Sequence, residues 1–293
     1  MFSGSIPALV TPFRNGLVDK TAFAALVERQ IAAGCAALVP VGTTGETSTL
    51  STEEHKAVVS LCVEVAAGRV PVIAGAGSNA TEEAIDLVRH AKAVGADAAL
   101  VVCPYYNKPD QAGLFAHFKA INDAIALPVF LYNVPGRTIV DLMPQTVAAL
   151  AALPNIIGIK DASDEMERVA LHSHLIGPGE QFIQLSGEDS SALAHRAMGG
   201  AGCISVTANV LPEACAAMHA AFDDGDLETA RAINQRLVLL HRAMFCSPSP
   251  GPAKYALSRM GLCTQEVRLP ITPPDAEARA QIDAALRHAG VDI

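Results

Sequence analysis

Tryptophan is absent from the 293 residues of this chain, and aromatic residues together make up only 4%. A dense core must therefore be built from alanine, valine, leucine and isoleucine, side chains typical of helices packed on parallel strands. Charged residues are also scarce, at 17%, whereas hydrophobic residues reach 51%. This balance excludes a disordered chain, because burial of so much apolar surface can offset the entropy lost on folding. A folded chain of this mass should expose roughly 12,000 Å².

Positive charge is in short supply. The 21 Lys and Arg residues face 30 Asp and Glu residues, and the net charge is −9. The basic residues are scattered, whereas a nucleic-acid surface needs clustered positive charge. No apolar run approaches the ~20 residues of a membrane span, and the first residues, MFSGSIPALVTPF, lack the basic region of a signal peptide. We therefore expect a cytoplasmic protein with neither a membrane nor a nucleic acid as partner.

Paired cysteine motifs are missing as well. The seven cysteines form no Cys-x-x-Cys pair, and an odd number cannot all be joined in disulfides within one chain. This usage is typical of reduced, mostly buried thiols rather than of a disulfide framework or a zinc site.

Eight short runs of continuously apolar residues, bounded by Gly or Pro, have the pattern of buried strands. They are residues 6–10, 36–41, 70–74, 98–103, 128–132, 156–160, 182–186 and 202–206. Their starts are about 28 residues apart on average, the length of one strand–helix unit. Eight such units predict an α/β fold, a closed (β/α)₈ TIM barrel over residues 1–224.

Capping signals mark the helices between these runs. Asp19 precedes a helical stripe that stops at Gly34, and residues 51–54 have the spacing of a capping box. After the eighth unit, Asp226 can cap a further helix, and helical patterns continue to residue 288. We therefore expect residues 225–293 to form a helical C-terminal extension packed on the barrel.

Barrel enzymes place their reactive groups at the carboxyl ends of the strands. Lys160 ends the sixth apolar run and is the only one of seven lysines in such a setting. A lysine there is expected to lose hydration, which disfavours the charged ammonium and frees the amine to attack a carbonyl. It could instead pair with Asp161 or emerge into water at the strand end. Position alone leaves these readings open.

Other strand ends carry groups that suit the same chemistry. In residues 42–46, GTTGE, two hydroxyls and accessible backbone N–H groups could hold a carboxylate and a proton chain, or simply form a turn before a helix. Tyr132 could pass protons beside the lysine, although buried tyrosines often serve only the core. Arg137 could grip a carboxylate with two hydrogen bonds. Tyr105 and Tyr106 place two more phenols on a loop.

Four motifs together resemble the dihydrodipicolinate synthase family of pyruvate-dependent class I aldolases. They are GTTGE at 42–46, YYNKP at 105–109, YNVPGRT at 132–138 and IIGIKD at 156–161. The resemblance spans essentially the whole chain. The aldolase group shares GTTGE and the lysine, whereas Arg137 points to the synthase. The resemblance implies a lyase of lysine and diaminopimelate biosynthesis that condenses pyruvate with aspartate 4-semialdehyde, without metal or cofactor, as a homotetramer.

The resemblance also implies roles for single residues. Lys160 would form the imine with pyruvate, and Tyr132 would donate and accept the proton. Thr43 and Tyr106 would complete a proton relay, with Tyr106 reaching in from a neighbouring subunit. The residues implied to bind the substrates are Thr44, Ile204, Gly187 and Arg137, the last at the carboxylate of aspartate 4-semialdehyde.

A second implied site concerns feedback inhibition by lysine. The positions that resemble this allosteric site are Ser48, His55, Asn79, Glu83 and Tyr105. Thr52 stands where lysine-inhibited relatives often carry a histidine, which puts the strength of inhibition in doubt. Ser249 stands where relatives often carry an asparagine. Coupling between the two sites would require lysine to bind more tightly to one of two conformations.

Three other readings compete with these assignments. Residues 75–80, GAGSNA, followed by Asp97, have the spacing of a dinucleotide-binding loop and would suggest a nicotinamide-dependent oxidoreductase. Cleavage of N-acetylneuraminate or of a sugar acid would use the same imine chemistry, but Arg137 favours a short substrate that ends in a carboxylate. His172 and His174 could suggest a metal site, but residues two apart do not share a helix face and no third ligand is apparent, so we expect both to face the solvent.

Overall fold

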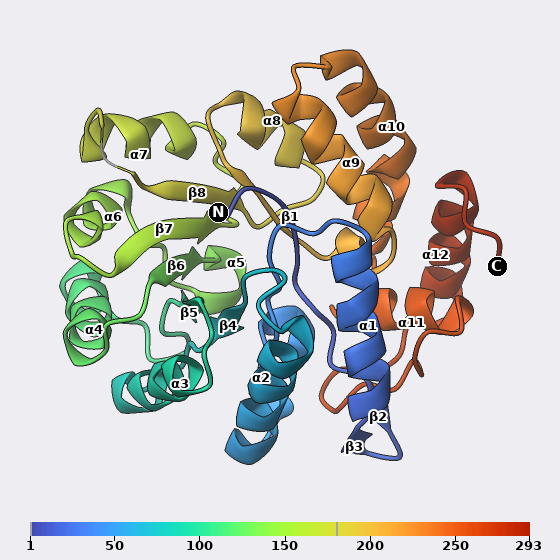
Figure 1. The fold of residues 1–293 in the computed structure, drawn as a ribbon, viewed down its shortest axis with the longest axis horizontal. Coiled ribbons are helices and arrows are strands. Elements are labelled where there is room, and N and C mark those ends of the chain that lie inside the picture. The colour runs from blue at the N-terminus through green and yellow to red at the C-terminus, as the bar shows by residue number, and fades with distance from the viewer. Residues whose placement is uncertain (1, 180) are drawn as a thin grey trace.

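The structure is a computed structural model that describes residues 2–179 and 181–293. Within these residues, parallel strands curl around the centre of the molecule and helices surround them (Figure 1). The sheet order is β1-β9-β8-β7-β6-β5-β4, so the first strand pairs with the last. The strands are β1 (Gly4–Pro7), β4 (Ile73–Gly75), β5 (Ala98–Val102), β6 (Val129–Asn133), β7 (Ile156–Asp161), β8 (Ile183–Ser186) and β9 (Gly202–Ser205). The exposed surface is 11955 Å², as the scaling laws predict.

The strand predicted at residues 36–41 does not form as a regular strand. Two isolated parallel bridges take its place, joining Ala8 to Val39 and Leu38 to Val72. These bridges fill the gap between β1 and β4 and close the barrel. The run is hydrogen-bonded on both sides, since the N–H of Val39 donates to the carbonyl of Pro7 and the N–H of Leu38 donates to the carbonyl of Pro71, and it ends at Val41, whose backbone is left-handed with φ 48°. The predicted (β/α)₈ barrel is confirmed, although one of its eight strands is reduced to these bridges.

Helices cover the outside of the barrel, and the short hairpin β2 (Phe13–Arg14) and β3 (Leu17–Val18) precedes them. The helices are α1 (Lys20–Ala32), α2 (Thr52–Ala66), α3 (Thr81–Ala93), α4 (Gln111–Ala124), α5 (Pro135–Thr138), α6 (Pro144–Ala151), α7 (Arg168–Ile176), α8 (Ala192–Ala197), α9 (Pro212–Asp223), α10 (Leu227–Ala243), α11 (Gly251–Arg259) and α12 (Ala276–His288). Three short 3₁₀ turns are η1 (Thr43–Gly45), η2 (Thr47–Thr49) and η3 (Thr207–Asn209).

The predicted caps are confirmed. Asp19 accepts a hydrogen bond of 3.0 Å from the N–H of Ala22 at the start of α1. Ser51 and Glu54 form both bonds of a capping box at α2, and Asp226 accepts from the N–H of Thr229 at α10. Each carboxylate or hydroxyl satisfies an N–H group that the first helical turn leaves without a partner.

Two layers of apolar side chains alternate along the strands. Inside the barrel, the side chains of Ile6, Leu100 and Phe130 meet in one cluster. Between the strands and the helices, Val101 and Leu131 pack with helical residues in a second cluster. Since neighbouring residues of a strand point to opposite faces, both faces of the sheet are apolar and the strands read as continuous hydrophobic runs.

The C-terminal helices lie along one side of the barrel, where α12 ends the chain at the right of Figure 1. Their apolar residues, among them Leu240, Leu257 and Ile282, form one cluster with Val10 and Val206 from the ends of the barrel strands. This part of the chain therefore packs directly on the end of the barrel at which β9 stops.

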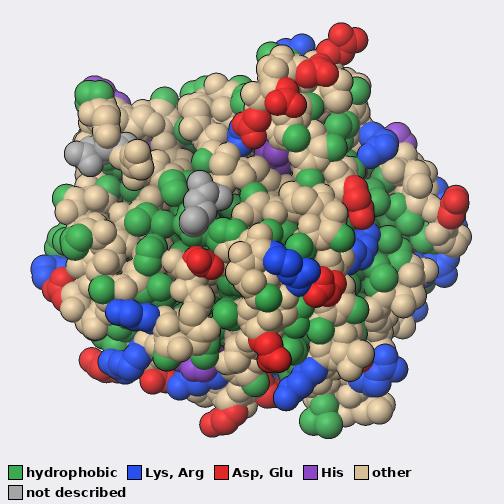
Figure 2. Space-filling model, viewed as in Figure 1, with side chains coloured by type: hydrophobic (Ala, Val, Ile, Leu, Met, Phe, Trp, Pro, Cys, Tyr) green, Lys and Arg blue, Asp and Glu red, His purple; other side chains and the backbone are tan. Residues whose placement is uncertain are grey.

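The cysteines and the surface agree with the expectations from composition. All seven cysteines are free, and five of them are buried. Basic and acidic side chains are interspersed on the face seen in Figure 2, with no continuous basic region. None of the described helices is long and apolar enough to cross a membrane.

Candidate active site

Lys160 lies at the carboxyl end of β7 and points into the barrel. Its register partners are Tyr132 on β6 and Leu185 on β8. The Lys160 Nζ atom lies 4.2 Å from the centre of the Tyr132 ring, and both side chains are buried. The parallel register thus places the amine directly beside a phenol, as expected for the two strand ends.

The competing reading, in which Lys160 pairs with Asp161, is wrong. In residues 2–179 and 181–293, Lys160 takes part in no ion pair. Asp161 points to the other face of β7, because successive residues of a strand alternate. Its Oδ1 atom accepts a hydrogen bond of 2.8 Å from the N–H of Ser163. Lys160 is therefore a buried amine without a carboxylate partner in the part of the chain described.

A cavity of about 570 Å³ opens above Lys160, and we call it the Lys160 cavity. It brings together six of the predicted site residues, which are Thr43, Thr44, Tyr132, Arg137, Lys160 and Gly187. Ser249 lies on its wall as well, together with Glu188 and Phe245. The strand ends, the β-α loops and the segment before α11 thus converge on one space.

Two predicted residues are not on the wall of this cavity. Ile204 is buried inside the barrel at β9, below the cavity. Tyr106 is 91% exposed and has a left-handed backbone with φ 73°. Within a single chain, the Tyr106 phenol therefore stays in solvent, away from Lys160.

The loop that carries Thr43 and Thr44 is folded into the 3₁₀ turn η1. The N–H of Gly45 donates to the carbonyl of Gly42 at 2.9 Å, and the Thr11 hydroxyl donates to the carbonyl of Gly45 at 2.7 Å. The carbonyl of Val41 would lie only 2.4 Å from a Cβ atom at Gly75. Glycine at position 75 therefore allows the loop to lie tightly against β4.

Arg137 lies on α5, and a polar network holds the segment that follows it. The Asn133 side chain donates to Asp141 at 2.8 Å and accepts from the N–H of Leu142 at 3.0 Å. Arg168 donates to both oxygens of Asp141, at 2.8 and 2.6 Å. Burial raises the pKa of Asp141, but Arg168 and Asn133 outweigh it and the net direction is down. The sequence gives no local signal for this network, because Asp141 and Arg168 are 27 residues apart.

Gly187 stands directly against the lysine. A Cβ atom at this position would lie 3.0 Å from Lys160 Cε and 2.7 Å from Ala162 Cβ. Only glycine fits here without moving its neighbours, so this residue leaves the space that the Lys160 side chain needs.

A second cavity, of about 140 Å³, gathers four of the five residues predicted for lysine inhibition, and we call it the His55 cavity. These are Ser48, His55, Glu83 and Tyr105. The fifth, Asn79, lies beside it and donates to the carbonyl of Tyr105 at 3.1 Å. Thr52 is also on the wall. Burial lowers the pKa of His55 to about 4, and neither ring nitrogen has a hydrogen-bond partner among the described residues.

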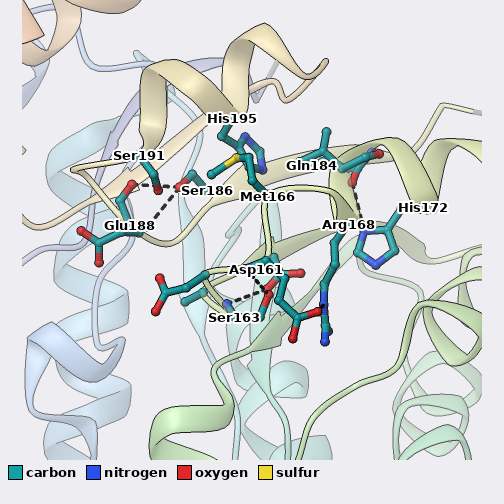
Figure 3. A pocket seen from close by; sticks show the side chains of 14 residues that line it. Asp161, Ser163, Met166, Arg168, His172, Gln184, Ser186, Glu188, Ser191 and His195 are labelled. Carbon is teal, nitrogen blue, oxygen red and sulfur yellow. Dashed lines mark hydrogen bonds and ion pairs between the residues drawn. The ribbon is translucent and has the colours of Figure 1, made fainter.

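A third cavity, of about 20 Å³, lies on the outer face of β7, and Figure 3 shows its walls. This volume is enough for one water molecule. His172 lines it and is buried, which corrects the expectation that His172 faces the solvent. Its Nδ1 atom lies 3.0 Å from Gln184 Oε1. Burial raises the pKa of Asp161, which lines the same cavity.

The glycines of the dinucleotide-like loop have a packing role. Gly75 approaches Val41, and a Cβ atom at Gly77 would lie 2.5 Å from the backbone nitrogen of Val102. The loop follows β4 of a closed barrel rather than the first strand of an open sheet. The structure therefore accounts for these glycines without a nucleotide.

Comparison with known proteins agrees with the geometry. The model of the dihydrodipicolinate synthetase family matches residues 1–289. The 4-hydroxy-tetrahydrodipicolinate synthase of Hyphomonas neptunium is 79% identical over 292 residues, which cover 100% of both chains. That of Phenylobacterium zucineum is 59% identical and covers 99% of this chain and 98% of its own.

Solved structures share the fold over their full length. The chloride-inhibited dihydrodipicolinate synthase of Acinetobacter baumannii, in complex with pyruvate, is 46% identical with a TM-score of 0.96 and covers 100% of both chains. The enzyme of Cyanidioschyzon merolae with lysine bound is 38% identical with a TM-score of 0.95 and covers 99% of both. This chain therefore belongs to the dihydrodipicolinate synthetase family.

Proposed function

We infer that this chain catalyses the 4-hydroxy-tetrahydrodipicolinate synthase reaction, a lyase step of lysine and diaminopimelate biosynthesis in which pyruvate condenses with aspartate 4-semialdehyde. The observation that carries this inference is the buried amine of Lys160, which lies 4.2 Å from the Tyr132 ring in a cavity shared with Thr43, Thr44 and Arg137. The named relatives at 79% and 59% identity support the same reaction.

Lys160 supplies the nucleophile. Its neutral amine attacks the ketone carbon of pyruvate, and loss of water leaves an imine. The imine acidifies the neighbouring methyl group, and loss of one proton from it gives an enamine. The enamine carbon then bonds to the aldehyde carbon of the second substrate, whose oxygen takes up a proton. The substrate's own amine finally replaces Lys160 at the imine carbon, which closes the ring and frees the enzyme.

Tyr132 and Thr43 move the protons. Both line the Lys160 cavity, and the Tyr132 phenol is the hydroxyl beside the amine. We assign the third member of the relay to Tyr106 of a neighbouring copy of the chain, because 91% exposure leaves its own phenol free to enter another subunit. This assignment requires an oligomer, and we propose a homotetramer built as a dimer of dimers.

The carboxylates of the two substrates are met by different groups. Thr44 offers a hydroxyl and a backbone N–H near the pyruvate carboxylate, and Gly187 and Ile204 shape the floor below it. Arg137 stands farther along the wall, where its guanidinium can hold the carboxylate of aspartate 4-semialdehyde through two hydrogen bonds. Two fixed anchors bring the reacting carbons together.

We also propose that lysine binds in the His55 cavity and inhibits the enzyme. Glu83 offers a carboxylate to the ammonium groups of lysine, and Tyr105 connects this cavity to the neighbouring relay residue Tyr106. The lysine-bound relative of Cyanidioschyzon merolae supports this proposal. Seven free cysteines, five of them buried, are consistent with a reducing compartment, and we place the enzyme in the cytoplasm.

Reduction with borohydride tests the assignment of Lys160. Addition of borohydride together with pyruvate should convert the imine into a stable amine, and the added mass should map to Lys160 by peptide mass spectrometry. The Lys160→Ala variant should trap no pyruvate and should lose condensation activity with aspartate 4-semialdehyde. Trapping in that variant, or trapping at another lysine of the wild type, would refute the assignment.

A further inference from the structure

The loop that carries Thr43 and Thr44 ends at a buried carboxylate. Glu46, the next residue after η1, has only 3% of its side chain exposed. Its backbone is left-handed, with φ 58° and ψ 37°, and separates η1 from η2. Its N–H donates to the carbonyl of Thr43 at 3.1 Å. The backbone of Glu46 is therefore hydrogen-bonded directly to the residue that carries the first hydroxyl of the relay.

Two groups from the C-terminal part of the chain hold this carboxylate. The fully buried Lys254 on α11 donates from Nζ to one oxygen of Glu46. The N–H of Arg268 donates to the other oxygen at 2.9 Å. Lys254 Nζ also donates to the carbonyl of Glu266 at 2.8 Å and lies 3.9 Å from the centre of the Phe13 ring. Lys254 and Arg268 are more than 200 residues from Glu46 in the sequence, and Phe13 belongs to the N-terminal hairpin.

Arg268 extends the network to both sides of the loop. Its guanidinium donates to the carbonyl of Thr49, at the end of η2, and to both oxygens of Glu54 on α2. This contact lowers the pKa of Glu54 to about 2. The segment between the relay hydroxyls and α2 is thus attached to the C-terminal part at its beginning and at its end.

The burial of this pair is a poor source of stability. Transfer of two charges from water into the protein interior costs about as much as their attraction returns, and apolar side chains of the same size would often be as stable. Burial lowers the pKa of Lys254, and the Glu46 carboxylate is the main group that acts against that shift. The contribution of the pair is to geometry rather than to stability, because its hydrogen bonds fix the position of the Glu46 side chain and, with it, of the Glu46 backbone.

We propose that Glu46 and Lys254 form a positioning pair through which the C-terminal helices hold the Thr43–Thr44 loop in place for proton transfer in the Lys160 cavity. The same stretch of chain places Ser249 on the wall of that cavity, just before α11. The C-terminal part is then a component of the active site rather than an appendage of the barrel. This inference rests on the proposed imine chemistry.

Exchange of the pyruvate methyl hydrogens for deuterium isolates the step that the pair should affect. In D₂O, formation and reprotonation of the enamine replace these hydrogens without the second substrate, and NMR follows the exchange. Borohydride trapping reports imine formation at Lys160 separately. If the wild type neither traps nor exchanges, the proposed function fails. Differences between the variants test the positioning pair alone.

The main variant replaces both charges, as Glu46→Gln with Lys254→Met, so that no unpaired charge stays buried. We expect a folded protein that still traps pyruvate at Lys160 but exchanges the methyl hydrogens about 10- to 100-fold more slowly, since small misplacement of a relay group has effects of this size. The turnover number for condensation should fall by a similar factor, with a smaller change in KM for pyruvate. Exchange at the wild-type rate in the folded double variant would overturn the proposal.

A matched control separates positioning from general loss of stability. Arg196 is buried, pairs with Asp223, and contacts the carbonyl of Ala201 at the amino end of β9, far from the strand ends that line the cavity. Arg196→Met with Asp223→Asn should lower the unfolding midpoint and leave exchange unchanged. Equal slowing in this control would also overturn the proposal.

A milder variant covers the case in which the double variant does not fold. Glu46→Asp keeps the charge and both carboxylate oxygens for Lys254 and for the N–H of Arg268, so no unpaired charge is left buried, but it shortens the side chain by one methylene group. We expect exchange to slow by about 3- to 10-fold, because a small displacement of the relay costs less than the larger one in the double variant. An exchange rate equal to that of the wild type would count against the positioning pair.

Discussion

Two lysines of this chain are buried, and their surroundings separate their uses. Lys254 has no exposed surface and donates to the carboxylate of Glu46. Lys160 is 7% exposed, and its amine has no carboxylate partner among the described residues. A buried ammonium needs such a partner to stay charged, whereas a nucleophilic amine must be free of one. The difference in partners therefore indicates that Lys254 holds part of the structure in place, whereas Lys160 is the lysine that can react with a substrate.

Replacement of Arg137 by Ala should affect one substrate only. Because imine formation with pyruvate uses the amine of Lys160 and not the guanidinium on the cavity wall, borohydride trapping of pyruvate should be unchanged. The value of kcat/KM for aspartate 4-semialdehyde should fall by about 100-fold, the effect of about 3 kcal/mol of lost charge-assisted hydrogen bonds. Steady-state kinetics with each substrate varied in turn measures this. An unchanged KM and kcat for the semialdehyde would contradict the role of Arg137.

Gly187→Ala tests the space around the lysine. The added methyl group would lie 3.0 Å from Lys160 Cε and 2.7 Å from Ala162 Cβ, so the lysine or strand β7 must move. We expect imine formation with pyruvate to slow by about 10-fold or more, because displacement of a reacting group by a fraction of an ångström is costly. Rapid-quench trapping with borohydride gives the rate. Wild-type trapping kinetics would show that the lysine tolerates the methyl group.

The sequence identifies residues whose position follows from a strand end, and it misses partners that are brought together only by the fold. Lys160 and Tyr132 end apolar runs, and Arg137 lies on the loop that follows one of them, so the barrel rule locates all three. Glu46 and Lys254 are 208 residues apart, and no periodicity connects them. The spacing of His172 and His174 argues against a metal site but does not show which ring is buried, and the His172 ring lies 3.0 Å from Gln184 Oε1 of β8.

At the scale of elements, the sequence predicts best those features that depend on residues close together in the chain. The caps at Asp19, Ser51 and Asp226 are fixed by residues within three positions, and the structure has each of them. The predicted run at 36–41 ends instead at Val41, whose left-handed backbone leads into the GTTGE loop. Valine does not favour that conformation, so nothing local predicts it.

Gly77→Ala should destabilise the barrel at the β4–β5 boundary. A Cβ atom there would lie 2.5 Å from the backbone nitrogen of Val102 and 2.6 Å from its Cγ1 atom, and a strand backbone cannot move aside easily. We expect a loss of about 1 to 3 kcal/mol in the free energy of unfolding, typical of overpacked sites. Urea denaturation followed by circular dichroism measures it.

Gly136→Ala is the control for this change. No atom lies within 4 Å of a Cβ built at Gly136, and the residue is in the helix α5. Alanine there should leave the stability unchanged or raise it slightly, because it restricts the unfolded chain. Equal losses in both variants would show that space around the Cβ atom does not determine the effect.

At the scale of the whole molecule, the C-terminal helices and the barrel share one apolar cluster and one polar network. Leu257 and Ile282 pack with Val206, and Lys254 and Arg268 hold the loop that ends at Glu46. The division at residue 224 into a barrel and an extension stays a prediction. These contacts indicate that residues 225–293 and the barrel fold as one cooperative unit, and we propose that neither part is stable alone.

Stability should also depend on pH through buried histidines. Burial lowers the pKa of four rings to about 4, and these are His55, His117, His195 and His219. In the unfolded chain the same rings have a pKa near 6.5 and bind protons that the folded rings do not. Because the unfolded state then binds more protons, the stability from the neutral rings is complete above about pH 6.5 and is lost as the pH falls toward 4.

Each ring should cost about 2 kcal/mol of unfolding free energy between pH 7 and pH 5, so that four rings together approach the total stability of a typical domain. Carboxylates titrate mostly below pH 5, so this interval isolates the histidines.

The measurement is the urea midpoint at pH 7, 6 and 5 for the wild type and for His117→Gln. His117 lies outside the proposed sites, with Nδ1 at 3.0 Å from the Thr81 hydroxyl. The variant should lose about 2 kcal/mol of the pH dependence, whereas a slope parallel to that of the wild type would show that His117 is not neutral in the folded protein.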